Sequence, residues 1–170
     1  MRLLFPETQI RSLSAAYTLG PLEPQIMDMR SRVSSAGFLT RDQLYVVARW
    51  KAARSAEHVL KNSEAYVREV TAFALGASEE RSRIEALTVL DGVLWPSASV
   101  VLHMFHQEPY PILDFRALES LGEEVPKQYT FAYWWNYVLH CRKLATKHKL
   151  SMRELDRALW QHSAAKRLEA

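Results

Sequence analysis

Asp114 is the residue of this chain whose type and position could do chemistry. It lies in the segment YPILDFRALESLG, Tyr110 to Gly122, directly before a predicted helix that begins at Phe115. Because Pro111 favours an extended entry, Asp114 is expected at the N-terminus of that helix, where capping and the helix dipole favour an ionised carboxylate. Aspartate is also a common structural cap, so the position fits either a capping or a catalytic residue.

A second stretch, LDGVLWPSASVVLHM, runs from Leu90 to Met104 and predicts a helical hairpin. A helix that ends at Leu90 needs an exit, and Gly92 can adopt a positive φ without a steric penalty. Pro96 suits the first turn of the next helix, where a missing N–H costs little. The unpaired N–H groups at that helix start would suit a phosphate oxygen. Gly92 is equally explained as a glycine that ends a helix.

Together these stretches resemble the helix-hairpin-helix DNA glycosylase superfamily. The shared pattern is a Leu-x-Gly-Val turn between two helices, then an apolar helix, then Pro111-x-x-Asp114. More narrowly, the chain resembles a compact bacterial branch related to 8-oxoguanine glycosylases. The matching core covers Leu87 to Gly122.

The resemblance implies a reaction on duplex DNA. Family members extrude a damaged or modified base and hydrolyse its N-glycosidic bond through an oxocarbenium-like sugar. Asp114 matches the family's aspartate, whose carboxylate would stabilise the developing positive charge and orient or deprotonate water. The hairpin would hold the DNA backbone through Gly92, Val93, Leu94 and Trp95.

Three departures from the family pattern shape the expected activity. Leu94 stands where the family hairpin usually has a second glycine, and its side chain can obstruct a phosphate. Pro96 stands where the bifunctional branch has a lysine nucleophile, so base excision without lysine-dependent lyase activity is expected. One cysteine, Cys141, excludes the iron–sulfur cluster of glycosylases that use four. Leu94 and Pro96 also leave open a non-catalytic helical module that binds DNA or protein.

Other side chains are weaker candidates for the site. Trp50, Tyr133 and Trp134 could stack on an extruded base, although most aromatic residues at helical spacing lie in a core. Arg116 could contact a phosphate, form an ion pair with Asp114, or be an ordinary surface arginine. No metal or cofactor is expected, because the histidines at 103 and 106 share a helix face but lack an evident third ligand.

Basic residues gather in two segments. Residues 142–170 contain eight Lys or Arg and three Asp or Glu, a balance of +5 that is compatible with an anionic partner such as DNA. A solvated helix face is the alternative. The second segment, RWKAAR, contributes Arg49, Lys51 and Arg54, which we expect to form an ion-paired surface.

Helical patterning covers nearly the whole chain, which predicts an all-α fold. We expect one domain over residues 1–170, with about eight or nine helices in two small lobes around a cleft, and the hairpin and aspartate segment at 87–122. Capping boxes are predicted at Thr40-x-x-Gln43 and Ser151-x-x-Glu154. Further signals are N-caps at Ser63 and Ser78, a helix end at Gly76, and helices near Gln9–Leu19, Pro24–Ala36 and Thr130–His148.

Composition limits the class of protein. Hydrophobic residues make up 48% and charged residues 24%, enough apolar material for a sizeable core. The single cysteine excludes a disulfide framework and fits a reducing cytoplasm. The start MRLLFPETQI has too short an apolar run for a signal peptide, and no run approaches the roughly 20 residues of a membrane span. We therefore expect a cytoplasmic protein that does not contact the membrane.

Overall fold

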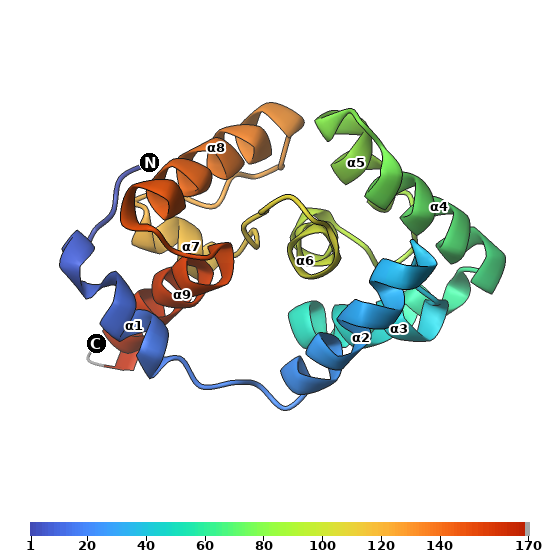
Figure 1. Cartoon of the computed structure of the whole chain (residues 1–170), viewed down its shortest axis with the longest axis horizontal. Helices are drawn as coiled ribbons and strands as arrows, with labels where there is room; N and C mark the ends of the chain where they lie inside the picture. The colour runs from blue at the N-terminus through green and yellow to red at the C-terminus, as the bar shows by residue number, and fades with distance from the viewer. Residues whose placement is uncertain (169–170) are drawn as a thin grey trace. The chain divides into compact units, whose positions relative to one another are not determined.

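The computed structural model describes residues 1–168, and over that range it contains helices and no strands (Figure 1). The prediction of an all-α fold is therefore confirmed. The α-helices and the short 3₁₀ helices, labelled η, are in chain order η1 (Glu7–Gln9), α1 (Ile10–Ala16), α2 (Glu23–Ala36), α3 (Arg41–Ala52), η2 (Ala56–Lys61), α4 (Glu64–Gly76), α5 (Glu80–Leu87), α6 (Trp95–Phe105), α7 (Phe115–Ser120), α8 (Phe131–His148) and α9 (Met152–Leu168).

The chain forms two compact units. The terminal unit combines Met1–Thr18 with Pro109–Ala170, and the central unit comprises Leu19–Glu108. The predicted hairpin therefore belongs to the central unit, whereas Asp114 belongs to the terminal unit.

Helix α6 forms the core of the central unit. It packs against α2, α3 and α5, and appears nearly end-on in Figure 1. Its buried residues include the small side chains of Ser97, Ala98 and Ser99, which allow neighbouring helices to approach closely. Val100, Val101 and Leu102 are fully buried, so the helix is enclosed on several sides rather than along one stripe. This burial fixes the position of the hairpin that precedes α6.

Helix α9 organises the terminal unit. It packs against α1, α7 and α8, which brings the first helix of the chain beside the last (Figure 1). The predicted apolar face is present, because Leu155, Ala158 and Leu159 are buried. The N-terminal segment of the chain is joined to α7 by a backbone hydrogen bond from Leu4 N to Ser120 O (2.9 Å). These contacts hold the segment that carries Asp114.

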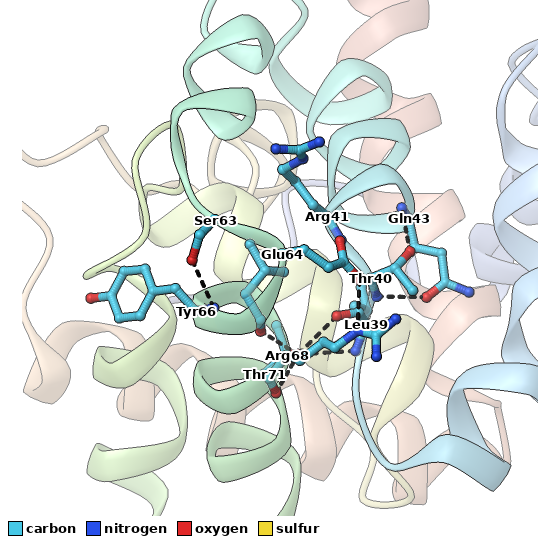
Figure 2. Close-up of polar contacts among 10 residues, drawn as sticks. Leu39, Thr40, Arg41, Gln43, Ser63, Glu64, Tyr66, Arg68 and Thr71 are labelled. Atoms are coloured by element: carbon cyan, nitrogen blue, oxygen red, sulfur yellow. Dashed lines mark hydrogen bonds and ion pairs between the residues drawn. The ribbon is translucent and has the colours of Figure 1, made fainter.

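Side-chain caps define several helix starts as predicted. Thr40 and Gln43 form a capping box at the start of α3, with each side chain accepting from the other's backbone N–H (Figure 2). Ser63 caps α4 by accepting from Tyr66 N. Ser151 and Glu154 form the predicted box before α9.

The α3 start is also bound to α4. The backbone N–H of Arg41 donates to Glu64 Oε2 (2.9 Å), and Leu39 N donates to the buried hydroxyl of Thr71 (2.9 Å), as Figure 2 shows. Thr71 in turn donates to Val67 O within α4. These bonds pair two helices of the central unit in a fixed register.

Some predicted helix boundaries are wrong. Ser78 does not cap α5, which begins at Glu80 after an extended Glu79. That helix ends at Leu87 and not at Leu90, because the chain continues in turns through the hairpin. The first helix ends at Ala16, before Leu19. Gly76 is the last residue of α4, as expected.

Within residues 1–168, no helix has the length and apolar character needed to cross a bilayer.

Candidate functional site

The hairpin turn lies between α5 and α6, and it has the positive backbone angle that its glycine predicted. Gly92 has φ +80°, and Val93 N donates to Leu90 O (3.0 Å) to close the turn. Val93 is buried, but the Leu94 side chain is 67% exposed. The turn thus anchors one apolar residue in the core of the central unit and presents the next to solvent.

The start of α6 has no side-chain cap. Leu94 occupies the N-cap position, and its apolar side chain accepts no hydrogen bond from the first turn. Trp95 is the first helical residue and Pro96 the second, which is where a proline is tolerated. Helix starts in general leave backbone N–H groups that can bind an oxygen ligand, although Pro96 contributes none to this one.

Gly92 is packed against the backbone of η2. A Cβ atom placed on Gly92 would lie 2.8 Å from Val59 N and 3.0 Å from Ser55 O, both closer than normal contacts. Any larger residue would therefore push the hairpin away from η2. Glycine at this position is explained by the close approach as well as by the backbone angle.

Asn62 holds the same turn from its other side. The Asn62 Nδ2 donates to Asp91 O (3.0 Å), and Asp91 N donates to the Asn62 Oδ1 (3.1 Å). Nδ2 also donates to Val59 O (2.9 Å). Sequence reasoning missed this residue, because an asparagine beside the Ser63 cap carries no periodic or motif signal.

Asp114 caps α7. Its Oδ1 accepts from Arg116 N (2.8 Å), and its backbone is extended, as expected for an N-cap residue. The residue is half-buried, and its carboxylate interacts electrostatically with the neighbouring Tyr129. Burial raises the pKa of Tyr129, and the negative charge of Asp114 raises it further. The capping role of Asp114 is thus confirmed, and it places the carboxylate beside a phenol.

Arg116 contacts Asp114 through its backbone N–H, while its guanidinium lies over aromatic rings. Its Cζ is 5.0 Å from the ring centroid of Trp160 and 5.2 Å from that of Phe115. Phe115 also lies beneath Arg167, at 5.0 Å. The first turn of α7 therefore carries a surface of arginine and aromatic side chains next to the aspartate.

The three aromatic candidates have different environments. Trp134 is fully buried and stacks on Tyr110, with ring centroids 5.8 Å apart, so it is a core residue of the terminal unit. Tyr133 is half-buried in the same unit. Trp50 is half-buried in the central unit, beside Gly20. The structure does not bring these three side chains together in one unit.

Four basic residues of the C-terminal segment make contacts within the terminal unit. Arg142 donates to Pro109 O and lies over Tyr110, while Lys147 binds Glu7 at 2.7 Å. Arg153 and Arg167 form ion pairs with Asp156 and Glu119, respectively. These contacts neutralise part of the segment's positive charge, with Glu7 and Glu119 as the carboxylates from outside the segment.

Comparisons with models of known protein families, with curated proteins and with solved structures find no match. Among residues 1–168, no group of three or more histidine, cysteine, aspartate or glutamate side chains is placed to hold a metal ion. Cys141 is buried in the terminal unit. The structure thus describes two separate candidate features: the hairpin with its η2 support in the central unit, and the capped aspartate in the terminal unit.

Proposed function

We propose that this protein is a monofunctional DNA glycosylase of the helix-hairpin-helix type, which hydrolyses the N-glycosidic bond of a modified or damaged base in duplex DNA. The proposal depends on one observation. A helical hairpin that turns through Gly92 at φ +80° is followed along the chain by a half-buried aspartate, Asp114, at the start of α7.

The hairpin supports a role in holding the DNA backbone. Its turn is rigid, because Gly92 packs on η2 and Asn62 binds the backbone of Asp91. A rigid turn before a helix start without a side-chain cap presents backbone N–H groups in a fixed geometry. Gly92, Val93, Leu94 and Trp95 are assigned to this contact, with Arg116 as a further phosphate ligand from the terminal unit.

Asp114 is assigned the catalytic role. Its Oδ1 is oriented by the Arg116 N–H at 2.8 Å, so the carboxylate has a defined direction before any substrate binds. A carboxylate held beside the C1′ atom of an extruded nucleotide would stabilise the oxocarbenium-like transition state and deprotonate water. Pro96 offers no amine, so the product is an abasic site in an intact strand.

The test is abasic-site formation on duplexes that carry a panel of modified bases, with wild type compared with Asp114→Asn. Asparagine caps a helix about as well as aspartate, so the variant keeps α7 while it loses the charge. We expect the rate of base release to fall by about 10²-fold or more. Asp28→Asn, an exposed aspartate on α2, is the matched control and should retain the wild-type rate.

The hairpin also supports a second candidate, a non-catalytic helical module that binds DNA. The observation in its favour is Leu94, whose side chain is 67% exposed at the position where a phosphate would approach the turn. Duplex binding that weakens with salt, without base release from any member of the panel, would select this candidate. Equal rates for wild type and Asp114→Asn would overturn the role of Asp114.

A further inference from the structure

The last turn of α3, the loop that follows it and η2 form a basic surface, which we call the α3–η2 loop (residues 49–61). It contains four Lys or Arg and one Glu, a formal charge of +3. That glutamate, Glu57, accepts a hydrogen bond from the Tyr45 hydroxyl. An open hollow of about 490 Å³ lies in this loop, lined by Lys51, Ala52, Ala53, Arg54, Ser55 and His58.

This hollow adjoins the hairpin turn. Ser55 lines the hollow, and its carbonyl oxygen lies 3.0 Å from the Cβ position of Gly92. At the other end of η2, Asn62 binds the backbone of Asp91 in the same turn. The α3–η2 loop and the hairpin are therefore packed directly against each other in the central unit.

Contacts within the protein explain only part of this positive charge. Lys51 lies in the last turn of α3, where the helix dipole favours a cation, and Arg49 lies over the ring of Tyr45. Arg54 and His58 lie beyond that helix and are exposed. Among the residues that the structure describes, no carboxylate forms an ion pair with Arg54. The sequence-based expectation of an ion-paired surface does not hold for this arginine.

We infer that the hollow of the α3–η2 loop binds a phosphate group of a nucleic-acid backbone. Lys51 and Arg54 supply the charge, and the His58 ring a further polar contact. A backbone is preferred to a free phosphate because the hairpin turn that leads into α6 packs on Ser55, which lines the hollow, and the start of α6 suits a second phosphate of the same strand. This inference rests on the proposed function only in taking DNA as the ligand, and it adds a binding site outside the hairpin.

The test measures binding of a fluorescent, unmodified duplex by anisotropy over a range of sodium chloride concentrations. Lys51→Gln/Arg54→Gln is compared with wild type, and Arg54→Gln alone serves as a milder variant because Arg54 is exposed. We expect at least a ten-fold loss of affinity for the double variant at low salt. The slope of log K against log[salt] should become shallower by about 0.9 for each phosphate contact removed.

Arg30→Gln/Arg32→Gln is the matched control, since it removes the same charge from exposed positions on α2 in the same unit. Thermal unfolding followed by circular dichroism verifies that each variant is folded. If both double variants lose the same affinity, the effect is one of net charge, and the inference is overturned. The inference would also be overturned if Lys51→Gln/Arg54→Gln bound the duplex with the same affinity as wild type. Absence of duplex binding by the wild-type protein would overturn it as well.

Titration with inorganic phosphate distinguishes the two sources of the ligand. Weak phosphate binding together with strong duplex binding supports a backbone site, whereas equal affinity for both overturns the choice of nucleic acid. Failure of the proposed function would give a different result from failure of this inference. Wild type that binds the unmodified duplex through this loop but releases no base keeps the inference and overturns the glycosylase activity.

Discussion

The side-chain amide of Asn62 is hydrogen-bonded to both backbone groups of Asp91, at 3.0 Å to the carbonyl oxygen and 3.1 Å from the N–H. The amide thus replaces the pairing that a neighbouring backbone would provide. Asn62 directly follows η2 and is only 5% exposed. The hairpin turn is therefore held by a residue nearly thirty positions earlier in the chain.

Asn62→Ala is expected to lower the free energy of unfolding by about 1–3 kcal/mol, because backbone groups of Asp91 lose their partner. Urea unfolding followed by circular dichroism measures the change. Asn136→Ala, an exposed asparagine on α8, is the control and should change stability by less than about 0.5 kcal/mol. Equal losses for the two variants would show that the Asn62 contact contributes little.

Alanine substitutions at Gly92 and Gly37 separate the loss of stability caused by a close contact from the loss caused by a left-handed backbone angle. Their φ values are +80° and +77°, but a Cβ on Gly37 would meet nothing within 4 Å, whereas one on Gly92 would meet Val59 N at 2.8 Å. Gly37→Ala should cost about 1 kcal/mol, from the left-handed conformation alone. Gly92→Ala should cost more, because the hairpin must also move away from η2.

Chemical denaturation of both variants measures this difference. If they are equally destabilised, the hairpin tolerates displacement from η2, and its rigidity is not maintained by this contact. A larger loss for Gly92→Ala, accompanied by weaker duplex binding, would connect the packing of the turn to its proposed role.

The sequence predicts the fold class and the local signals well, for physical reasons that lie within a few residues. The capping box of Thr40 with Gln43, the Ser63 cap and the Asp114 cap each depend on side chains that bind backbone within their own first turn. Ser78 fails as a cap because the chain stays extended to Glu79 before α5 begins. The helix starts one residue later than the serine predicts, and Glu79 at its N-cap position makes no side-chain cap.

The support of the candidate site could not be predicted in the same way. Asn62 and Asp91 are far apart in sequence, and nothing in the hairpin pattern around Asp91 indicates Asn62 as its partner. The hollow beside Arg54 depends on how η2 packs against Gly92, which no periodic pattern indicates. Trp134 has the same residue type and helical setting as a surface aromatic, and it is a core residue because Tyr110, Phe131 and Trp135 pack around its fully buried ring.

Tyr133 and Tyr137 lie on α8 and differ in the partner of the hydroxyl group. Tyr137 is fully buried and donates to Ile112 O (2.8 Å). The Tyr133 oxygen is buried without a hydrogen-bond partner among the described residues, and burial raises its pKa to about 12. Tyr137→Phe should cost about 1–3 kcal/mol, because it leaves a buried carbonyl unpaired.

Tyr133→Phe removes a hydroxyl that makes no bond, so it should leave stability unchanged or raise it by up to about 1 kcal/mol. Thermal unfolding of both variants tests the pair. A loss for Tyr133→Phe as large as that for Tyr137→Phe would mean that the Tyr133 hydroxyl has a partner in solution.

Glu64 should give the central unit an acid-dependent component of stability. The Arg41 N–H and then the Arg68 guanidinium hold the pKa of Glu64 below its usual value of 4.5. A group whose pKa is lower in the folded state stabilises fully above its unfolded pKa, and this stabilisation disappears as the pH falls through the folded pKa. The contribution should therefore be constant near neutral pH and decline below about pH 4.5.

Glu64→Gln tests this directly, because glutamine keeps an acceptor for Arg41 N but has no charge. With a side chain 42% exposed, Glu64 should contribute less than about 1 kcal/mol at pH 7, and the difference from wild type should shrink towards zero by about pH 3. Urea unfolding at a series of pH values measures it, and Glu69→Gln, an exposed glutamate on the same helix, is the control. A difference that stays constant from pH 7 to about pH 3 would show that Glu64 acts through its shape and not through its charge.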